Sequence, residues 1–456
     1  MRFDAQMLAA WGGGVLEGSP CEVRGVTQDS RRVSPGCLYV ALRGERFDGH
    51  DFVSQALADG AAVALVDHHS GLRGLPLIRV ADTRRALQDI ARAWRLRCGA
   101  RVIGLTGSAG KTTTKEMAAA CFSGGGPVCA TQGNLNNDIG LPLSLLTMTR
   151  ETAFGIFEAG MNHPGEIARL ADILKPHVAI ISSIGRAHIE FFGSVEAIAR
   201  EKGELLRVLP SDGFAVLCRE TAHFDVLAGM SSAPVVTVSL AARDADFFGE
   251  VLDVCAGRVR VTEQATGERV ELASGLPGAH NASNLLLAFA AGRRAGVSAD
   301  AAVEGMARFS MPGKRWEVSA RGGVTIVNDA YNANPDSMRV ALETFMRVPC
   351  EGRRMVVLGD MRELGGHSET SHEEVGRQVA ALRPDFFVAV GGQMRRCAVR
   401  EAVAQGFPAA RVFEADTAQE AAALVWGVAR AGDGVLLKAS RGMALEDVLG
   451  GAMTAG

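Results

Sequence analysis

The stretch GLTGSAGKTTTKE at residues 104–116 has the composition and order of a loop that holds a nucleotide triphosphate. Such a loop needs glycines, because backbone N–H groups must point inward, followed by the positive end of a helix and a lysine that meets phosphate oxygens. Gly107, Gly110 and Lys111 supply these features. Thr112 follows where a hydroxyl would bind Mg²⁺. The stretch therefore predicts binding of a triphosphate with its magnesium ion.

One position departs from the common pattern G-x-x-x-x-G-K-[ST], because Leu105 stands where the first glycine is expected. The loop instead reads T-G-x-x-G-K-T-T, and Thr106 and Gly107 begin its turn. A glycine-rich turn with an incidental lysine is the alternative interpretation. The flanking residues argue against it, since a strand-like apolar run at 102–105 precedes the loop and TTTKEMAAACF continues it as a helix.

Three residues further along could complete a nucleotide and metal site. Glu158 ends an apolar strand-like run, His188 follows another such run, and Lys202 lies on the helix that comes next. The carboxyl edge of a parallel sheet is where α/β proteins bind ligands, and Mg²⁺ prefers oxygen ligands. Each residue also has an ordinary explanation when it is taken alone. Glu158 could be an acid at a strand end, His188 a loop histidine with its own partner, and Lys202 a solvated helix lysine. Together with the loop, the functional interpretation is favoured for Glu158 and His188.

The hydrophobic pattern assigns these residues to a chain of three blocks. The first block has short strands broken by Gly, Asp and Pro, and a helix from 82 to 98 with Asp82 as its N-cap follows it. The second alternates helices with continuous apolar strands, which predicts a parallel sheet covered on both faces. After Cys218, short β-runs that begin with VVTVSL predict a small antiparallel sheet. Strands and helices alternate again from about residue 311, which predicts a second doubly wound unit.

We therefore predict an α/β protein, since a chain of 456 residues is too long for one hydrophobic core. The predicted domains are a small N-terminal α/β domain at 1–82, a central P-loop domain with a parallel and a small antiparallel sheet at 83–312, and a C-terminal Rossmann-like domain at 313–456.

Composition narrows the class of protein. A net charge of -3 argues against a bulk nucleic-acid binder. No apolar run approaches the roughly 18 residues of a membrane span, and the N-terminus lacks the pattern of a signal peptide. The nine cysteines are scattered without a CxxC pair, which is typical of free thiols in a reducing compartment. We expect a cytoplasmic monomer that does not bind nucleic acid and does not span a membrane.

A series of motifs that spans all three blocks resembles the Mur ligases. The motifs are TGSAGKTTTKE, TQGNLNNDIGLPLSLL, FEAGMNHPGEI, AHIEFFGSVEAIAREKGELL, GAHNASNLLLA, DAYNANPDSM, GDMRELG and LLKASRGMALE. The resemblance implies an N-terminal domain that holds the UDP end of a substrate, a central ATPase domain, and a C-terminal domain that closes over both.

The implied activity is ATP- and Mg²⁺-dependent formation of an amide bond in peptidoglycan synthesis. YNANP and the Ala-His-Asn of GAHNASN favour a ligase that joins D-alanyl-D-alanine to UDP-N-acetylmuramoyl-tripeptide. The rival member, which adds the third peptide residue, carries a D-N-P-R motif that is absent here. A folylpolyglutamate-synthetase-like ligase is a second rival, but it would not be expected to carry the uridine-site-like stretch at 29–52.

The implied chemistry activates a carboxylate. The γ-phosphate converts it into an acyl phosphate, an amine attacks, and the tetrahedral intermediate collapses to an amide and phosphate. By resemblance, Lys111 meets the β- and γ-phosphates, while Thr112 and Glu158 hold the ATP-side Mg²⁺. His188 resembles a ligand of a second Mg²⁺. Lys202 matches a lysine that the family carries as a carbamate, which would let it help hold the metal.

The resemblance implies a larger set of binding residues. ATP binding is assigned to Thr106, Gly107, Ser108, Ala109, Gly110, Lys111, Thr112, Thr113, Asn281, Arg315, Asp329 and Asn332. Lys314 precedes Arg315, so either cation could reach the phosphate. Lys438, Ser440 and Arg441 could face the incoming dipeptide.

Residues for the UDP substrate are assigned in the same way. They are Ser30, Arg31, Asp48, Gly49 and His50 for the uracil and diphosphate, and Asn134 and Asn137 along the muramyl-peptide path. Tight turns with caps are the alternative for the first five, because Asp, Ser and Gly form turns readily. A capped loop without a ligand is the alternative for the two asparagines.

Overall fold

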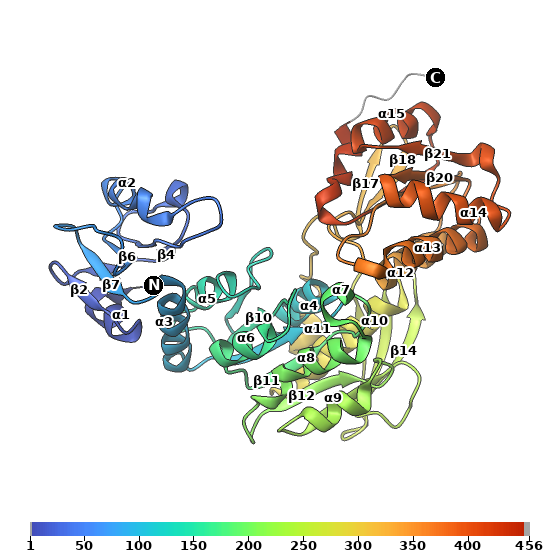
Figure 1. Ribbon diagram of the computed structural model, residues 1–456. Coiled ribbons are helices and arrows are strands. Elements are labelled where there is room, and N and C mark those ends of the chain that lie inside the picture. Colours follow the sequence, from blue (N-terminus) through green and yellow to red (C-terminus); the bar gives the residue numbers. More distant parts are fainter. Residues whose placement is uncertain (1, 451–456) are drawn as a thin grey trace.

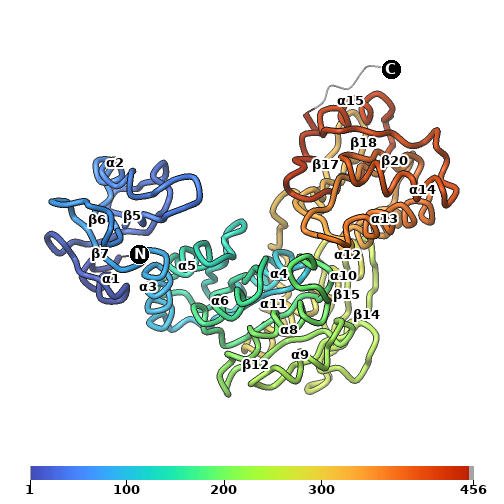
Figure 2. The backbone as a smooth tube through the Cα atoms, viewed as in Figure 1, coloured from blue at the N-terminus to red at the C-terminus, as the bar shows by residue number. Residues whose placement is uncertain are grey.

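The structure is a computed structural model that describes residues 2–450. Figures 1 and 2 show three lobes, with the blue N-terminal lobe and the orange-to-red C-terminal lobe at opposite ends of a central lobe. The predicted domain boundaries fall between the three main sheets, whose strands lie within 15–80, 101–273 and 317–438. The boundaries themselves stay a prediction. No helix in the described part of the chain is long and apolar enough to cross a membrane.

The N-terminal lobe is built on a five-stranded sheet in the order β2-β7-β6-β5-β4. Only the edge strand β2 pairs antiparallel, and β1 and β3 form a separate antiparallel pair. The elements are β1 (Phe3–Asp4), α1 (Ala5–Trp11), β2 (Val15–Glu17), β3 (Glu22–Val23), β4 (Val26–Thr27), β5 (Leu38–Val40), α2 (Val53–Ala58), β6 (Val63–Asp67) and β7 (Leu77–Val80).

Helix α3 (Thr83–Arg97) links this lobe to the central one. The Asp82 carboxylate accepts a hydrogen bond from the Arg85 amide, which confirms Asp82 as the N-cap. Ile90 and Trp94 are buried on one face of the helix. The helix contacts α1 on one side and α5 (Gly140–Leu145) and α6 (Glu166–Leu174) on the other. Its apolar face is therefore shared between the two lobes.

The central lobe has one nine-stranded sheet in the order β16-β15-β14-β13-β12-β11-β8-β10-β9. Its strands are β8 (Arg101–Thr106), β9 (Val128–Ala130), β10 (Phe154–Glu158), β11 (Val178–Ile181), β12 (Phe214–Cys218), β13 (Val235–Ser239), β14 (Phe247–Asp253), β15 (Arg258–Glu263) and β16 (Arg269–Ala273). Its remaining helices are α4 (Lys111–Ser123), α7 (Ile189–Phe192), α8 (Val195–Arg207), α9 (Phe224–Met230), α10 (Ala279–Arg294) and α11 (Ala299–Met306).

This sheet refines the sequence prediction of a separate antiparallel sheet. β13 pairs parallel with both β12 and β14, whereas β14, β15 and β16 pair antiparallel with one another. The antiparallel strands therefore extend the parallel sheet. The reason is that β14 pairs parallel with β13 along one edge and antiparallel with β15 along the other. No unpaired strand edge is left between the parallel and antiparallel strands.

The C-terminal lobe is a doubly wound unit with the strand order β17-β18-β22-β19-β20-β21, in which only β17 is antiparallel. Its strands are β17 (Glu317–Arg321), β18 (Val324–Asn328), β19 (Arg354–Gly359), β20 (Phe386–Val390), β21 (Val412–Ala415) and β22 (Gly434–Lys438). Its helices are α12 (Pro335–Arg347), α13 (Ser368–Leu382), α14 (Arg400–Ala404), which follows a π-helical turn at Met394–Val399, and α15 (Ala418–Val428). Together, the three lobes confirm the predicted α/β fold class.

Candidate active site

The glycine-rich loop connects β8 to α4, as the sequence predicts. The Lys111 ammonium folds back and donates a 2.7 Å hydrogen bond to the Gly107 carbonyl. A Cβ at position 107 would lie 2.0 Å from Ser182 Oγ, and one at position 110 would lie 2.7 Å from Asn284 Oδ1. Gly110 also has a φ of 77°, which favours glycine. Both glycines are therefore required by the close approach of neighbouring segments.

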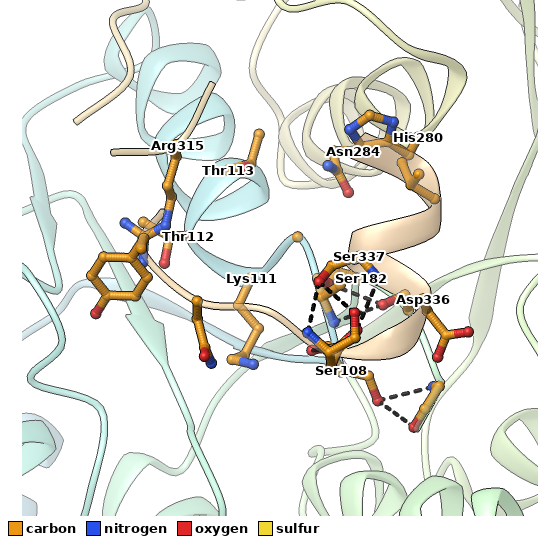
Figure 3. Close-up of a pocket in the computed structure, with 18 of the residues that line it drawn as sticks. Ser108, Lys111, Thr112, Thr113, Ser182, His280, Asn284, Arg315, Asp336 and Ser337 are labelled. Atoms are coloured by element: carbon orange, nitrogen blue, oxygen red, sulfur yellow. Dashed lines mark hydrogen bonds between the residues drawn. The ribbon is translucent and has the colours of Figure 1, made fainter. Parts of the chain in front are cut away.

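The loop opens into a cavity of about 930 Å³ that the central and C-terminal lobes line together. Figure 3 shows Ser108, Lys111 and Thr112 of the loop in one view with Arg315, Asp336 and Ser337 of the C-terminal lobe. The predicted site residues that line the cavity are Ser108, Ala109, Gly110, Lys111, Thr112, Thr113, Asn134, Asn137, Glu158, His188, Asn281, Arg315, Asp329 and Asn332. Sequence positions more than 200 residues apart are thus brought to one site.

Glu158 and Thr112 have the character of magnesium ligands. Glu158 is 1% exposed at the end of β10, and its amide donates a 3.0 Å hydrogen bond to Thr131 Oγ1. Its carboxylate oxygen Oε1 is buried and has no hydrogen-bond partner among the described residues. No group of three acidic, histidine or cysteine side chains that could cage a metal occurs in that part of the chain. One carboxylate and one hydroxyl nevertheless suit Mg²⁺, because this ion retains waters and takes further oxygens from phosphates.

Lys111 interacts electrostatically with this carboxylate, and a second, buried lysine, Lys202, interacts with Lys111. Burial lowers the pKa of the Lys111 amine, an effect that Glu158 opposes and Arg315 reinforces. Lys202 of α8 is 1% exposed, and burial, followed by repulsion from Lys111, lowers its pKa well below the ordinary value. Within residues 2–450, the Lys202 side chain forms no hydrogen bond or ion pair. Burial and the Lys111 charge both disfavour the protonated form of this amine, unlike the surroundings of an ordinary solvated lysine.

His188 lies on the loop after β11 with a φ of 61°, an uncommon value for a residue other than glycine. Its Nδ1 is 2.6 Å from a carboxylate oxygen of Glu363 in the C-terminal lobe, although the contact lacks the alignment of a hydrogen bond. The imidazole holds the pKa of the Glu363 carboxyl below its ordinary value. The sequence motif GDMRELG contains Glu363, but nothing in it identified this partner.

The structure separates the roles of the two adjacent cations Lys314 and Arg315. The Lys314 ammonium donates a 2.7 Å hydrogen bond to Glu446, away from the cavity lining. The Arg315 guanidinium stacks 3.7 Å from the centroid of the Tyr331 ring and lines the cavity. Arg315 is therefore the cation that faces the loop.

Lys438 lines the cavity, but its ammonium is already engaged. It donates hydrogen bonds to Asp329 Oδ2 at 2.6 Å and to the Asn332 carbonyl at 3.2 Å, and it is 3% exposed. The other oxygen of Asp329 accepts the Trp316 amide at 3.2 Å. This buried ion pair ties β22 to the segment that carries Arg315. Ser440 is likewise engaged, since its hydroxyl donates to the Ala333 carbonyl at 3.3 Å.

Most asparagine side chains of the site form hydrogen bonds with other residues of the protein. Asn281 donates from Nδ2 to the Pro277 carbonyl at 2.8 Å and accepts from Asn284, which in turn accepts from Thr114. Asn137 accepts from the amide of Gly140 at the start of α5, as the capped-loop alternative predicts. Asn134 lines the cavity, with no side-chain hydrogen bond to the described residues.

The remaining predicted residues lie outside the cavity lining. Thr106 and Gly107 are at the base of the loop, and Lys202 lies beneath the surface. Arg31 follows Ser30 in a short 3-10 turn and pairs with Asp29 at 2.9 Å. They belong to the N-terminal lobe, which Figure 1 shows at the opposite end of the molecule from the C-terminal lobe.

The DGH motif forms a buried network in the N-terminal lobe. His50 contacts Asp48 through Nδ1 at 2.6 Å and accepts the Asp67 amide through Nε2 at 3.1 Å. The Gly49 carbonyl accepts a 3.0 Å hydrogen bond from Tyr39. These contacts are the capped turn of the alternative interpretation, so the UDP assignments stay a prediction.

Several residues that line the cavity were not predicted from the sequence. Ser183 Oγ accepts the Ala109 amide at 2.9 Å, and Ser108 Oγ donates to the Gly185 carbonyl at 3.0 Å. Both serine contacts join the phosphate loop to the end of β11. That strand neighbours β8, so the carboxyl-edge rule that selected Glu158 could also have selected Ser183.

Comparison with known proteins gives matches along most of the chain. Residues 105–292 match the Mur ligase middle domain, residues 314–441 match the Mur ligase glutamate ligase domain, and residues 22–95 match the model described as Mur ligase family, catalytic domain. A relative from Escherichia coli K12 named UDP-N-acetylmuramoyl-tripeptide–D-alanyl-D-alanine ligase is 38% identical, over 86% of this chain and 87% of the relative. A Bacillus subtilis protein of the same name is 36% identical, over 94% of this chain and 92% of its own.

Solved structures agree with this relationship. MurF from Acinetobacter baumannii superposes with a TM-score of 0.89 at 31% identity, covering 99% of this chain and 98% of its own. MurF from Thermotoga maritima in complex with ADP gives a TM-score of 0.80 at 28% identity, covering 94% and 96%. Since the domain models, the relatives and the fold all agree, this chain belongs to the Mur ligase family.

Proposed function

We propose that this chain is an ATP-dependent ligase that joins D-alanyl-D-alanine to UDP-N-acetylmuramoyl-tripeptide, forming UDP-N-acetylmuramoyl-pentapeptide, ADP and phosphate. One observation carries the proposal: a phosphate loop with Lys111 and the unpartnered Glu158 carboxylate faces Arg315 of a second lobe across one cavity. The names of the relatives supply the substrates. A cytoplasmic monomer is the form that we propose.

The residues of the cavity suit transfer of a phosphoryl group to a carboxylate. Phosphoryl transfer depends mainly on positioning and on positive charge around the moving group. Lys111 of the central lobe and Arg315 of the C-terminal lobe would supply that charge. A Mg²⁺ ion held by Thr112 and Glu158 would neutralise further phosphate charge. The acyl phosphate then offers a good leaving group, and attack by the dipeptide amine forms the amide bond.

Lys202 supports the proposal in a second way. An amine reacts with carbon dioxide in its neutral form, giving a carbamate and a proton. The low pKa of the Lys202 amine favours that form, and its lack of a partner leaves it free to react. The resulting anion would lie close to Lys111 and could help hold the metal on the substrate side together with His188. The carbamate would thus replace a repulsion between two lysines by an attraction.

A direct test incubates the protein with ATP, Mg²⁺, UDP-N-acetylmuramoyl-tripeptide and D-alanyl-D-alanine, and follows products by mass spectrometry and phosphate release. We expect pentapeptide and phosphate in equal amounts, both dependent on the dipeptide. Reaction with a single amino acid on the UDP-dipeptide acceptor would support the rival ligase. Absence of both pentapeptide and phosphate would refute the proposal.

A further inference from the structure

The loop between β11 and α7, residues 182–188, is held by the C-terminal lobe at several points. Asp336 of α12 accepts the Arg186 amide at 2.8 Å, and Glu374 of α13 accepts from the Arg186 guanidinium at 2.7 Å. Asn334 donates to the carbonyl of Ser108, whose side chain contacts the same loop through Gly185. The position of this loop therefore depends on how the C-terminal lobe is docked.

His188 ends this loop and lines the cavity, and Glu363 is the carboxylate that the C-terminal lobe brings within 2.6 Å of its Nδ1. The His188 side chain is 17% exposed, whereas that of Glu363 is 45% exposed. Both residues have a φ of 61°, a conformation that costs free energy outside glycine and is retained only where surrounding contacts enforce it. An exposed carboxylate held in this way, against a partly buried ring, contributes little to the core. Its position is better explained by a role at the site.

The segment after Glu363 approaches the His188 loop closely. A Cβ on Gly365, which has a φ of 50°, would lie 2.9 Å from Glu190 Cγ. Glu190 belongs to α7, which begins directly after His188. The loop after β19 therefore packs closely against the segment that carries His188. This packing holds the backbone next to Glu363 in place.

We propose that Glu363 is a positioning residue that fixes the orientation of the His188 imidazole, and that it reaches His188 only when the C-terminal lobe is docked. The inference rests on the proposed function, in which His188 is a metal ligand. A histidine that binds a metal through one nitrogen usually contacts a carboxylate or carbonyl through the other, and loss of that partner costs about 10- to 100-fold in metal affinity or activity. The arrangement would make the substrate-side site complete only in the docked form.

The test compares full-length wild type with E363Q, E363D and the control E369Q. Glu369 is an exposed carboxylate of α13 whose contact with Arg400 is 3.5 Å long, so its replacement leaves the site intact. The first measurement is the imidazole ¹⁵N spectrum of the metal-free proteins, with the His188 signals assigned through H188Q. We expect E363Q to shift the His188 signals, E363D to shift them less, and E369Q to leave them unchanged.

The second measurement is the Mg²⁺ concentration that gives half-maximal ligation. We expect E363Q to raise it by about 10-fold or more, with the half-saturating ATP concentration within about twofold of wild type, because the phosphate loop is untouched. Unchanged His188 signals in E363Q, or an unchanged Mg²⁺ requirement, would overturn the inference. If the wild type forms no pentapeptide, the proposed function fails, while the spectra still decide whether Glu363 orients His188.

Discussion

Gly185 lies where the phosphate loop, the end of β11 and the C-terminal lobe meet, so G185A perturbs all three at one point. The φ of Gly185 lies outside the left-handed region, and alanine therefore fits the backbone. The added Cβ would lie 2.4 Å from Asp336 Oδ2, well inside van der Waals contact. The carboxylate must rotate away, and it loses its 2.8 Å hydrogen bond from the Arg186 amide.

The size of the effect follows from that lost contact. A hydrogen bond to a charged group contributes about 1.5 to 3 kcal/mol. About a third of the Asp336 side chain is exposed (36%), so water recovers part of this free energy. We therefore expect the docked arrangement of the C-terminal lobe to lose about 1 to 2 kcal/mol, a factor of about 5 to 30 in the ratio of docked to undocked protein.

The assay measures the turnover of ligation and the half-saturating ATP concentration for G185A, D336A and the double variant. In D336A the nearest remaining atom of residue 336 would be Cβ, 3.7 Å from the added methyl group, which is an ordinary contact. G185A should then cost turnover about 5- to 30-fold alone and little further in the D336A background. Thermal unfolding checks that the variants fold. Wild-type turnover in G185A, or an equal loss in both backgrounds, would refute the reasoning.

Three further predictions concern the cations of the site. K111A should lower ATP turnover by about 100-fold or more with unchanged thermal unfolding, because it removes the positive charge that we propose stabilises the transferring group; a steady-state phosphate assay measures this. K202A should lower ligation by about 10- to 100-fold and be partly rescued by added acetate, and full activity without rescue would contradict the carbamate. R315A should raise the half-saturating ATP concentration by about 10-fold, whereas K314A should change it by less than about twofold, since Lys314 pairs with Glu446 instead; equal effects in an ATP titration would reverse the assignment.

The parts of the site that the sequence predicts are those whose positions follow from local rules. The phosphate loop lies between a strand and a helix, so its glycines and Lys111 could be identified from spacing alone. Glu158 and His188 could be predicted to share one cavity because the carboxyl ends of parallel strands meet at one edge of the sheet. The roles of Lys314 and Arg315 could not be predicted from the sequence. Lys314 contacts Glu446 and Arg315 contacts Tyr331, and both contacts form only in the folded lobe.

Contacts between lobes were the other part that the sequence left open. Asp336 and Glu363 are polar residues at a helix start and in a loop, where a cap or a solvated acid is the ordinary expectation. Their partners, Arg186 and His188, lie more than 140 residues away along the chain. Only the docking of two lobes gives these carboxylates a role. Within the central lobe, the continuation of the parallel sheet into β14–β16 could not be distinguished from a separate antiparallel sheet, because it depends on which strands pair in the fold.

The central claim is that phosphate is placed on a peptide carboxylate before an amine replaces it. Ligation with a UDP-N-acetylmuramoyl-tripeptide whose terminal carboxylate carries ¹⁸O at both oxygens tests this most directly. Mass spectrometry of the released phosphate should find one ¹⁸O atom for each pentapeptide formed. Phosphate without the label, or labelled phosphate released at the same rate without D-alanyl-D-alanine, would contradict the account.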